Sequence, residues 1–156
     1  MSERVVNIRK ATQEDFPHVV RMIRELAAHV AAPFDPKVSE TILEKEGPLG
    51  RDRFRIFIAE EDGTPIGFCL YSFVFSGWRG ACGLFIEDLY VDYSARGLGI
   101  GRRLLIAALE AERSDGATFV KLEVSMENDG AIAFYKRMGF TLFEGERLMV
   151  LEAKNL

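Results

Sequence analysis

In the first part of the chain the spacing of apolar residues changes from every second position to every third or fourth. Alternation over residues 5–11 predicts a short strand, and the Thr-Gln-Glu-Asp sequence at 12–15 is typical of a capping box. From Phe16 to about Ala31 apolar side chains recur every three or four positions. This second period predicts an amphipathic helix that follows the strand directly.

The next part of the chain combines helix-capping signals with short apolar runs. A second helix is predicted to begin at Asp35-Pro36, an N-cap residue followed by a proline at the first helical position, and to end at Gly47-Pro48. Glycine-containing turns then separate apolar segments, which predicts neighbouring antiparallel strands. These strands are expected over residues 54–60, 65–75 and 84–91.

In the last part of the chain the helical and strand-like periods alternate once more. One apolar stripe predicts a helix over residues 100–111, and Asn128 is a plausible N-cap for a later helix that ends at Gly139. A strand is expected between them, over residues 119–124. A closing hairpin is expected from residues 140–143 and 147–151.

The resulting order is strand-helix-helix, three strands, helix-strand-helix and two strands. It predicts an α/β domain of the mixed α+β kind, with a central mixed sheet of about seven strands and helices on both faces. The strands at 84–91 and 119–124 are expected to be parallel neighbours joined by a right-handed crossover. A length of 156 residues suits a single domain over residues 1–156.

Composition narrows the class of protein further. A net charge of −4 argues against a general nucleic-acid binder. No segment approaches the roughly 18 apolar residues of a membrane span, and the polar start of the chain lacks a signal peptide, so we expect a cytoplasmic protein. Cys69 and Cys82 form no cluster with His18 or His29, so we expect no metal site.

A glycine-rich run, Arg96-Gly97-Leu98-Gly99-Ile100-Gly101, lies between the strand at 84–91 and the helix after it. The start of a helix leaves backbone N–H groups unpaired and carries a partial positive charge. Glycines at alternate positions let an anion approach the backbone, and Arg96 adds a cation. The run therefore predicts a phosphate or pyrophosphate site.

Two common phosphate ligands do not fit the residues around this run. A nucleoside triphosphate loop requires Gly-Lys-Ser/Thr, whereas Gly101 is followed by Arg102 and Arg103. A dinucleotide fingerprint, G-x-G-x-x-G/A, has Arg102 at its last position when it starts at Gly97, and Leu104 there when it starts at Gly99. Residue identity therefore argues against both.

The pattern R-x-x-G-x-G after a strand that ends Asp88-Leu89-Tyr90-Val91 resembles the acetyl-CoA pyrophosphate loop of the GNAT superfamily of N-acetyltransferases. The segment from Asn128 to Phe140 is similar to a later GNAT motif, whose asparagine and tyrosine lie against the CoA arm. The resemblance covers nearly the whole chain. It implies the GNAT acyl-CoA N-acyltransferase fold, acetyl-CoA as co-substrate without a metal, and a homodimer. The cofactor-binding residues that it implies are Leu89, Tyr90, Val91, Arg96, Gly97, Leu98, Gly99, Ile100, Gly101, Arg102, Asn128 and Tyr135.

A narrower resemblance is carried by residues 67–71, Trp78 and residues 85–91, which look like the diamine (spermidine/spermine-type) branch of the superfamily. That branch also includes enzymes that act on lysine-like amino acids. By this resemblance Glu87 acts on the amine and Tyr135 on the CoA sulfur. Asp88 and Trp78 are further candidate substrate contacts. Asp88 can instead cap or brace a neighbouring loop, and Trp78 can pack on the sheet or contact a second subunit. The chain departs from the branch at residues 28–33, where an acid that contacts the polyamine is missing.

The residues also meet the chemical demands of acetyl transfer to an amine. At pH 7 roughly one alkylamine in 2,500 is neutral, so a base must take the proton, and Glu87 is the candidate. Glu87 and Asp88 interrupt an apolar strand, which costs free energy unless they line a wet cleft. Glu87 on a solvent-facing side of the strand is the alternative. Tyr135 can protonate the leaving thiolate, and its alternative role is a core aromatic.

The resemblance further implies a bulge in the strand at 84–91 and a free backbone N–H at Leu89–Val91, which would bind the thioester carbonyl. We therefore expect an acetyl-CoA-dependent N-acetyltransferase that acts on a small primary amine by direct attack in a ternary complex. Two alternatives stay open at this point. The acceptor can be a protein N-terminus or lysine, or the domain can be a non-catalytic acyl-CoA-binding module.

Overall fold

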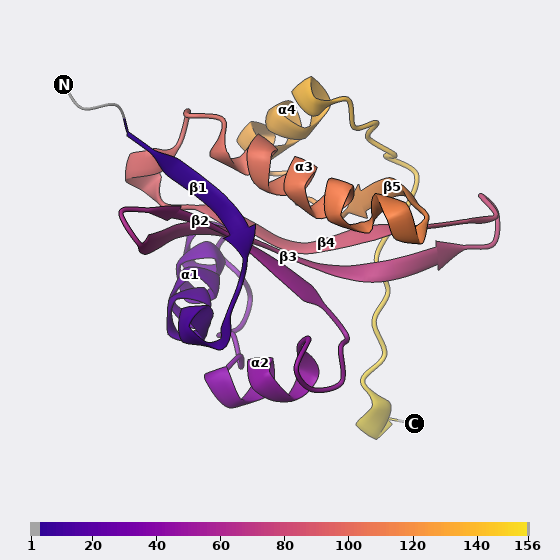
Figure 1. Cartoon of the computed structure of the whole chain (residues 1–156). Helices are drawn as coiled ribbons and strands as arrows, with labels where there is room; N and C mark the ends of the chain where they lie inside the picture. The colour runs from indigo at the N-terminus through magenta and orange to yellow at the C-terminus, as the bar shows by residue number, and fades with distance from the viewer. Residues whose placement is uncertain (1–3, 156) are drawn as a thin grey trace. The chain divides into compact units, whose positions relative to one another are not determined.

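Five strands form one mixed sheet in the order β1-β2-β3-β4-β5 (Figure 1). The computed structural model describes residues 4–155. Neighbouring strands from β1 to β4 pair antiparallel, and β4 pairs with β5 in parallel, as the crossover prediction required. The strands are β1 (Val6–Lys10), β2 (Arg55–Glu61), β3 (Thr64–Ser76), β4 (Ala81–Val91) and β5 (Ala117–Leu122).

Helices cover both faces of this sheet, as predicted. On one face α1 (Phe16–His29) and α2 (Glu40–Glu46) pack against a shared core that includes Phe68 and Tyr90. On the other face lies α3 (Ile100–Glu112), where the buried Tyr71 hydroxyl donates to the Glu112 carboxylate at 2.7 Å (Figure 1). The fourth helix, α4, spans Asp129–Met138.

The capping box before α1 is present. The buried Asp15 carboxylate accepts a hydrogen bond from the Thr12 backbone N–H at 2.7 Å, and it also pairs with the Arg9 guanidinium at 2.7 Å. The cap therefore fixes α1 to the end of β1. The helix ends at His29, two residues before the predicted end, and Ala31 adopts a left-handed conformation with φ of 50°.

The predicted start of the second helix was wrong. The helix α2 begins at Glu40, and Ser39 is its N-cap, with the Ser39 hydroxyl accepting from the Ile42 backbone N–H at 3.2 Å. Asp35 and Pro36 lie in the connection before the helix instead. Both Asp35 and Ser39 are good capping residues, and the chain uses the later one.

The predicted closing hairpin was also wrong, so the sheet has five strands rather than about seven. Within the described residues, 140–151 contain no strand. Strands need a partner, and an isolated two-stranded hairpin is marginal in water. Large apolar side chains of this segment, such as Phe143 and Met149, are exposed. The chain divides into two compact units, one that ends at Glu123 and one that begins at Val124.

Candidate active site

The strand β4 leaves β5 before its own end. Pairing with β5 stops at Ile86, opposite Leu122, whereas pairing with β3 continues to Val91, opposite Gly67. The last five residues of β4, Glu87–Val91, therefore have a paired side toward β3 and an open side that β5 no longer covers. We call these five residues the open half of β4.

Backbone donors face this open side. Antiparallel ladders alternate between residues that hydrogen-bond to the neighbour and residues that point away from it. The Asp92 N–H donates to the Ile66 carbonyl at 2.8 Å, so in the same register Leu89 and Val91 point away from β3. In agreement, the Val91 carbonyl accepts a bond from Arg96 rather than from β3. The N–H groups of Leu89 and Val91 are thus available to a ligand.

A bulge turns two carboxylates to one face of the sheet. Asp88 lies opposite Leu70 and Ile86 opposite Tyr71, so Glu87 is an extra residue without a direct partner on β3. Because a bulge interrupts the alternation, Glu87 and Asp88 both point toward the face covered by α1. The Ser72 hydroxyl donates to the Glu87 carboxylate at 3.0 Å on this face. The bulge lies in the strand for which it was expected, just before the backbone donors of Leu89–Val91.

The two carboxylates differ in their surroundings. Glu87 is exposed, whereas Asp88 is half-buried. Burial and the adjacent charge of Glu87 raise the pKa of Asp88 to about 6. Burial also raises the pKa of the Cys69 thiol, on β3 opposite Leu89, to about 12. At neutral pH this site therefore holds a carboxyl group close to its titration point and a thiol that keeps its proton.

The glycine loop gives an anion room to reach the backbone. Gly97 and Gly99 have φ values of +79° and +73°, which side chains rarely adopt, and a Cβ at either would meet no atom of the chain within 4 Å. Gly99 is the N-cap of α3, so the first N–H groups of the helix face this space. Ile100 is buried, which leaves only its backbone for a ligand.

Arginines differ in their roles around this loop. The Arg96 guanidinium lies 5.7 Å and 5.6 Å from the ring centres of Tyr90 and Tyr93, and its Nε donates to the Val91 carbonyl at 2.9 Å. Arg103 donates to the Val6 carbonyl at 2.8 Å and so ties α3 to β1. Arg102 is exposed beside it, and Leu98 is half exposed.

The second unit contains Asn128 and Tyr135, on α4. The Asn128 side-chain oxygen accepts from the Ala131 N–H at 3.1 Å, which confirms the predicted N-cap. The Tyr135 ring meets the rings of Phe134 and Phe140 edge-on, with centres 5.1 Å and 5.4 Å apart. These two ring contacts restrict the orientation of the Tyr135 phenol.

Trp78 does not join the carboxylates. It is fully exposed in the turn between β3 and β4. The last pair of that hairpin, Ser76 and Ala81, is five positions along β3 from Tyr71, beside the bulge. At about 3.4 Å per residue this is roughly 17 Å. Within one chain Trp78 therefore lies well away from Glu87 along the hairpin.

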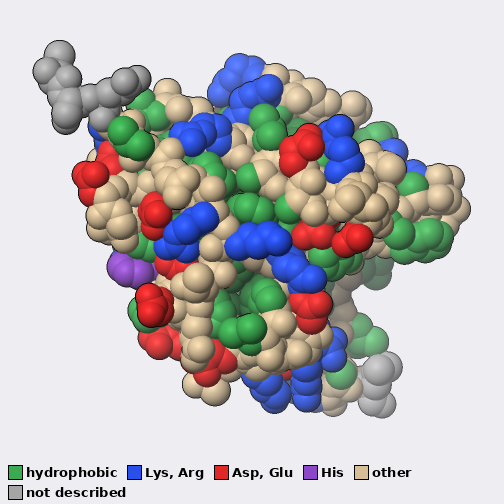
Figure 2. Space-filling view, viewed as in Figure 1, with side chains coloured by type: hydrophobic (Ala, Val, Ile, Leu, Met, Phe, Trp, Pro, Cys, Tyr) green, Lys and Arg blue, Asp and Glu red, His purple; other side chains and the backbone are tan. Residues whose placement is uncertain are grey.

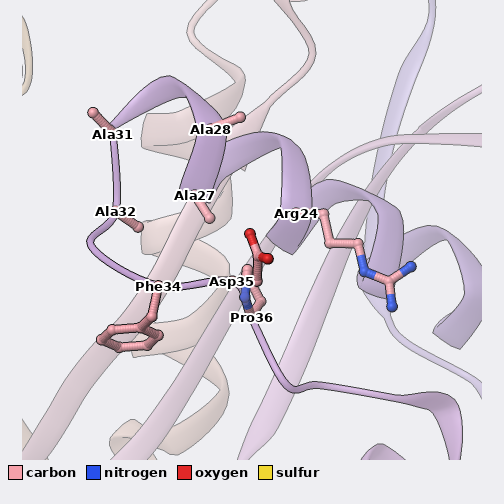
Figure 3. A pocket seen from close by; sticks show the side chains of 8 residues that line it. All are labelled: Arg24, Ala27, Ala28, Ala31, Ala32, Phe34, Asp35 and Pro36. Atoms are coloured by element: carbon pink, nitrogen blue, oxygen red, sulfur yellow. The ribbon is translucent and has the colours of Figure 1, made fainter.

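Sequence reasoning missed Asp35, which lines a pocket of about 440 Å³ at the end of α1 (Figure 3). In Figure 3 the Asp35 carboxylate points toward Ala27, and the exposed Phe34 ring lies at the other side of the pocket. Its position before a proline suggested a helix cap and concealed this placement. Ser72 was missed as well, because only the strand register brings it to Glu87.

The surface in Figure 2 mixes acidic and basic side chains on the face shown. Among residues 4–155, no group of three or more His, Cys, Asp and Glu side chains is arranged to hold a metal ion. None of the helices in this described part combines the length and apolarity that crossing a bilayer requires.

Known proteins resemble this chain in sequence and in structure. The model of the acetyltransferase (GNAT) family matches residues 9–140. A thialysine N-epsilon-acetyltransferase of Sus scrofa is 32% identical over 96% of this chain and 98% of its own length. A spermidine/spermine N(1)-acetyltransferase-like protein 1 of Homo sapiens is 28% identical over 85% of this chain and 20% of its own length.

Among solved structures, an aminoglycoside acetyltransferase from an uncultured soil metagenomic sample, in complex with sisomicin, has a TM-score of 0.76. It is 20% identical and covers 94% of this chain and 95% of its own, which supports the fold alone. The family model and the thialysine acetyltransferase extend over most of the chain and confirm the family expected from the sequence. The chain therefore belongs to the GNAT family and is an N-acetyltransferase.

Proposed function

We propose that this acetyltransferase moves an acetyl group from acetyl-CoA to a small primary amine, a polyamine or a lysine-like amine, by direct attack in a ternary complex. The observation that carries the proposal is the open half of β4. It combines backbone donors on the side that β5 leaves with two carboxylates on the face toward α1. Homodimer formation, a cytoplasmic location and a single domain over residues 1–156 stay predictions.

The donor side fits acetyl-CoA. The absence of Cβ atoms at Gly97 and Gly99, the start of α3 and the Arg96 guanidinium together suit a pyrophosphate. The N–H groups of Leu89 and Val91 suit the amide and thioester carbonyls of an extended arm. When bound, acetyl-CoA supplies the activated acyl group and a thiol leaving group.

The acceptor side fits an alkylammonium ion. Glu87, held by Ser72, accepts the proton of the amine directly or through water, and Asp88 beside it contributes a second acidic group. A carboxyl with a pKa of about 6, such as that of Asp88, is well matched to proton transfer near neutral pH. The relatives named for thialysine and for spermidine/spermine support an amine with a flexible alkyl chain.

Tyr135 is the proposed acid that protonates the departing thiolate. A phenol with a pKa near 10 keeps its proton at neutral pH and can donate it. We expect no covalent acetyl-enzyme. The Cys69 thiol, with a pKa of about 12, is a poor nucleophile, and Cys82 lies at the far end of β4 from the bulge.

Thiol release from acetyl-CoA tests the proposal with a panel of polyamines, lysine, thialysine and short peptides. We expect turnover with small amines, and a large loss of kcat but little change in CoA affinity in Tyr135→Phe. Turnover with peptides alone would favour a protein acceptor. A protein that binds CoA but transfers acetyl to none of these amines would favour the non-catalytic alternative.

A further inference from the structure

A network of side chains connects α1 to the end of the open half of β4. The proposed chemistry uses the backbone of this end but not its side chains. The Tyr90 hydroxyl donates to the Glu25 carboxylate at 2.6 Å. Arg21, one turn earlier on α1, donates to both Glu25 oxygens at 3.0 Å and pairs with Asp92 at 3.4 Å. Arg21 also reaches the Pro65 carbonyl at 3.4 Å.

The same tyrosine contacts the proposed pyrophosphate arginine. Arg96 lies over the Tyr90 ring and over the Tyr93 ring, and its Nε donates to the Val91 carbonyl. One N–H and two ring faces therefore determine the direction of the guanidinium. Because Tyr90 is one of these rings, its placement bears on the direction of Arg96.

Packing alone does not require the Tyr90 hydroxyl. The ring is buried in the core beneath α1, where it meets Phe68 with ring centres 6.5 Å apart. A phenylalanine would fill this space equally well. The Tyr90 hydroxyl instead bonds the Glu25 carboxylate, which is partly exposed. This bond fixes the end of β4 at a set position against α1.

We propose that Glu25 and Tyr90 are positioning residues for the donor: through their bond they set the direction of Arg96 and of the Tyr90–Val91 backbone, and so set the affinity for acetyl-CoA. The inference rests on the proposed function of the glycine loop. It assigns to α1, otherwise a helix of the core, an indirect part in donor binding.

The protonation states of the pair support a constant effect near neutral pH. The bond from Tyr90 lowers the pKa of Glu25, and burial together with Glu25 raises the pKa of Tyr90 to about 12. The charged groups that face the pair are Arg21, Asp92 and Arg96. Carboxylate and phenol therefore keep their present forms from pH 6 to 9, and the network contributes equally over this range.

The test compares Tyr90→Phe and Glu25→Gln with the intact protein. We expect the KM for acetyl-CoA and the Kd for CoA to rise about three- to tenfold, which corresponds to the typical net contribution of one hydrogen bond, while kcat changes less than twofold. The rise should be the same at pH 6.5 and pH 8.5. Glu110→Gln, which removes a surface ion pair with Arg113 on α3, is the matched control and should change neither constant.

Two further measurements separate positioning from a general loss of structure. In an Arg96→Ala background Tyr90→Phe should cost less CoA affinity than it does in the intact protein, whereas full additivity would overturn the proposal. The Nε–H nuclear magnetic resonance signal of Arg96 should shift and broaden in Tyr90→Phe and stay unchanged in Glu110→Gln. An unchanged Arg96 signal in Tyr90→Phe would overturn this inference. Failure of the intact protein to bind CoA would instead contradict the proposed function, and the Arg96 signal can be measured in either case.

Discussion

The two halves of β4 belong to one continuous strand but have different surroundings. Residues 82–86 pair with β3 on one side and with β5 on the other, and Leu84 and Ile86 are buried between the layers. Residues 87–91 pair with β3 alone, carry two acidic side chains and leave donors uncovered. The comparison teaches that the reactive part of this sheet begins where strand pairing stops.

Removing the charge of Glu87 gives the largest expected change in this comparison. In Glu87→Gln we expect kcat/KM for the amine to fall by about 10²–10⁴ at pH 7, because the proposed base is lost. The Ser72 hydroxyl can still bond the amide, so the fold should persist. Steady-state kinetics of thiol release measure the change, and Glu110→Gln, on α3, should keep its rate.

Substitution of a glycine should have different consequences on the two sides of the open half: a loss of CoA affinity after it and a loss of stability before it. At Gly99 an alanine requires a left-handed conformation, which costs about 1 kcal/mol, and puts a Cβ where the pyrophosphate is proposed to bind. In Gly99→Ala we expect CoA affinity to fall about tenfold or more. Titration calorimetry measures it.

The matched variant is Gly83→Ala, in the fully paired half. A Cβ there would approach the Phe119 carbonyl oxygen to 2.6 Å, so we expect a loss of stability of about 1–3 kcal/mol. Its folded protein should bind CoA normally. Equal losses of affinity in the two variants would contradict the distinction between the halves.

The charged Asp88 carboxylate in the open half should lower the stability of the folded protein at neutral pH. Its pKa of about 6 is above that of an unfolded chain, so the folded state binds the proton more tightly. Stability from this group therefore falls as pH rises from about 4 to 6, and the full cost is present above pH 6. We expect Asp88→Asn to raise the free energy of unfolding by about 1–3 kcal/mol at pH 7 and to leave it unchanged at pH 4. Urea titrations at both values check this, and equal gains would contradict it.

The pocket at the end of α1 offers the smallest expected effect. If the Asp35 carboxylate binds the distant ammonium of a diamine, Asp35→Asn should raise the KM for a diamine about two- to fivefold, the value of an exposed ion pair. The KM for a monoamine of equal length should stay the same. Parallel changes with both amines would remove Asp35 from acceptor binding.

Local chemistry predicted the start of α3 after the glycine loop and the Asn128 cap correctly, because helix starts are determined by a few neighbouring residues. Features that depend on distant partners could not be derived from local patterns, and only the family resemblance implied the bulge. The bulge at Glu87 exists only in the register between β3 and β4, and Glu25 and Tyr90 are 65 positions apart. The closing hairpin was predicted wrongly for the same reason, since periodicity does not show whether a segment finds a partner.

The central claim is that the carboxylate of Glu87 in the open half takes the proton of the amine, and the pH dependence of kcat/KM tests it most directly. The comparison uses the intact enzyme and Glu87→Gln with one polyamine from pH 6 to 9. The account predicts that the ratio of the two rates is largest at pH 6 and shrinks toward pH 9, as the neutral fraction of an amine with a pKa of about 10.4 grows about tenfold per pH unit. Profiles that run parallel over the whole range would contradict it.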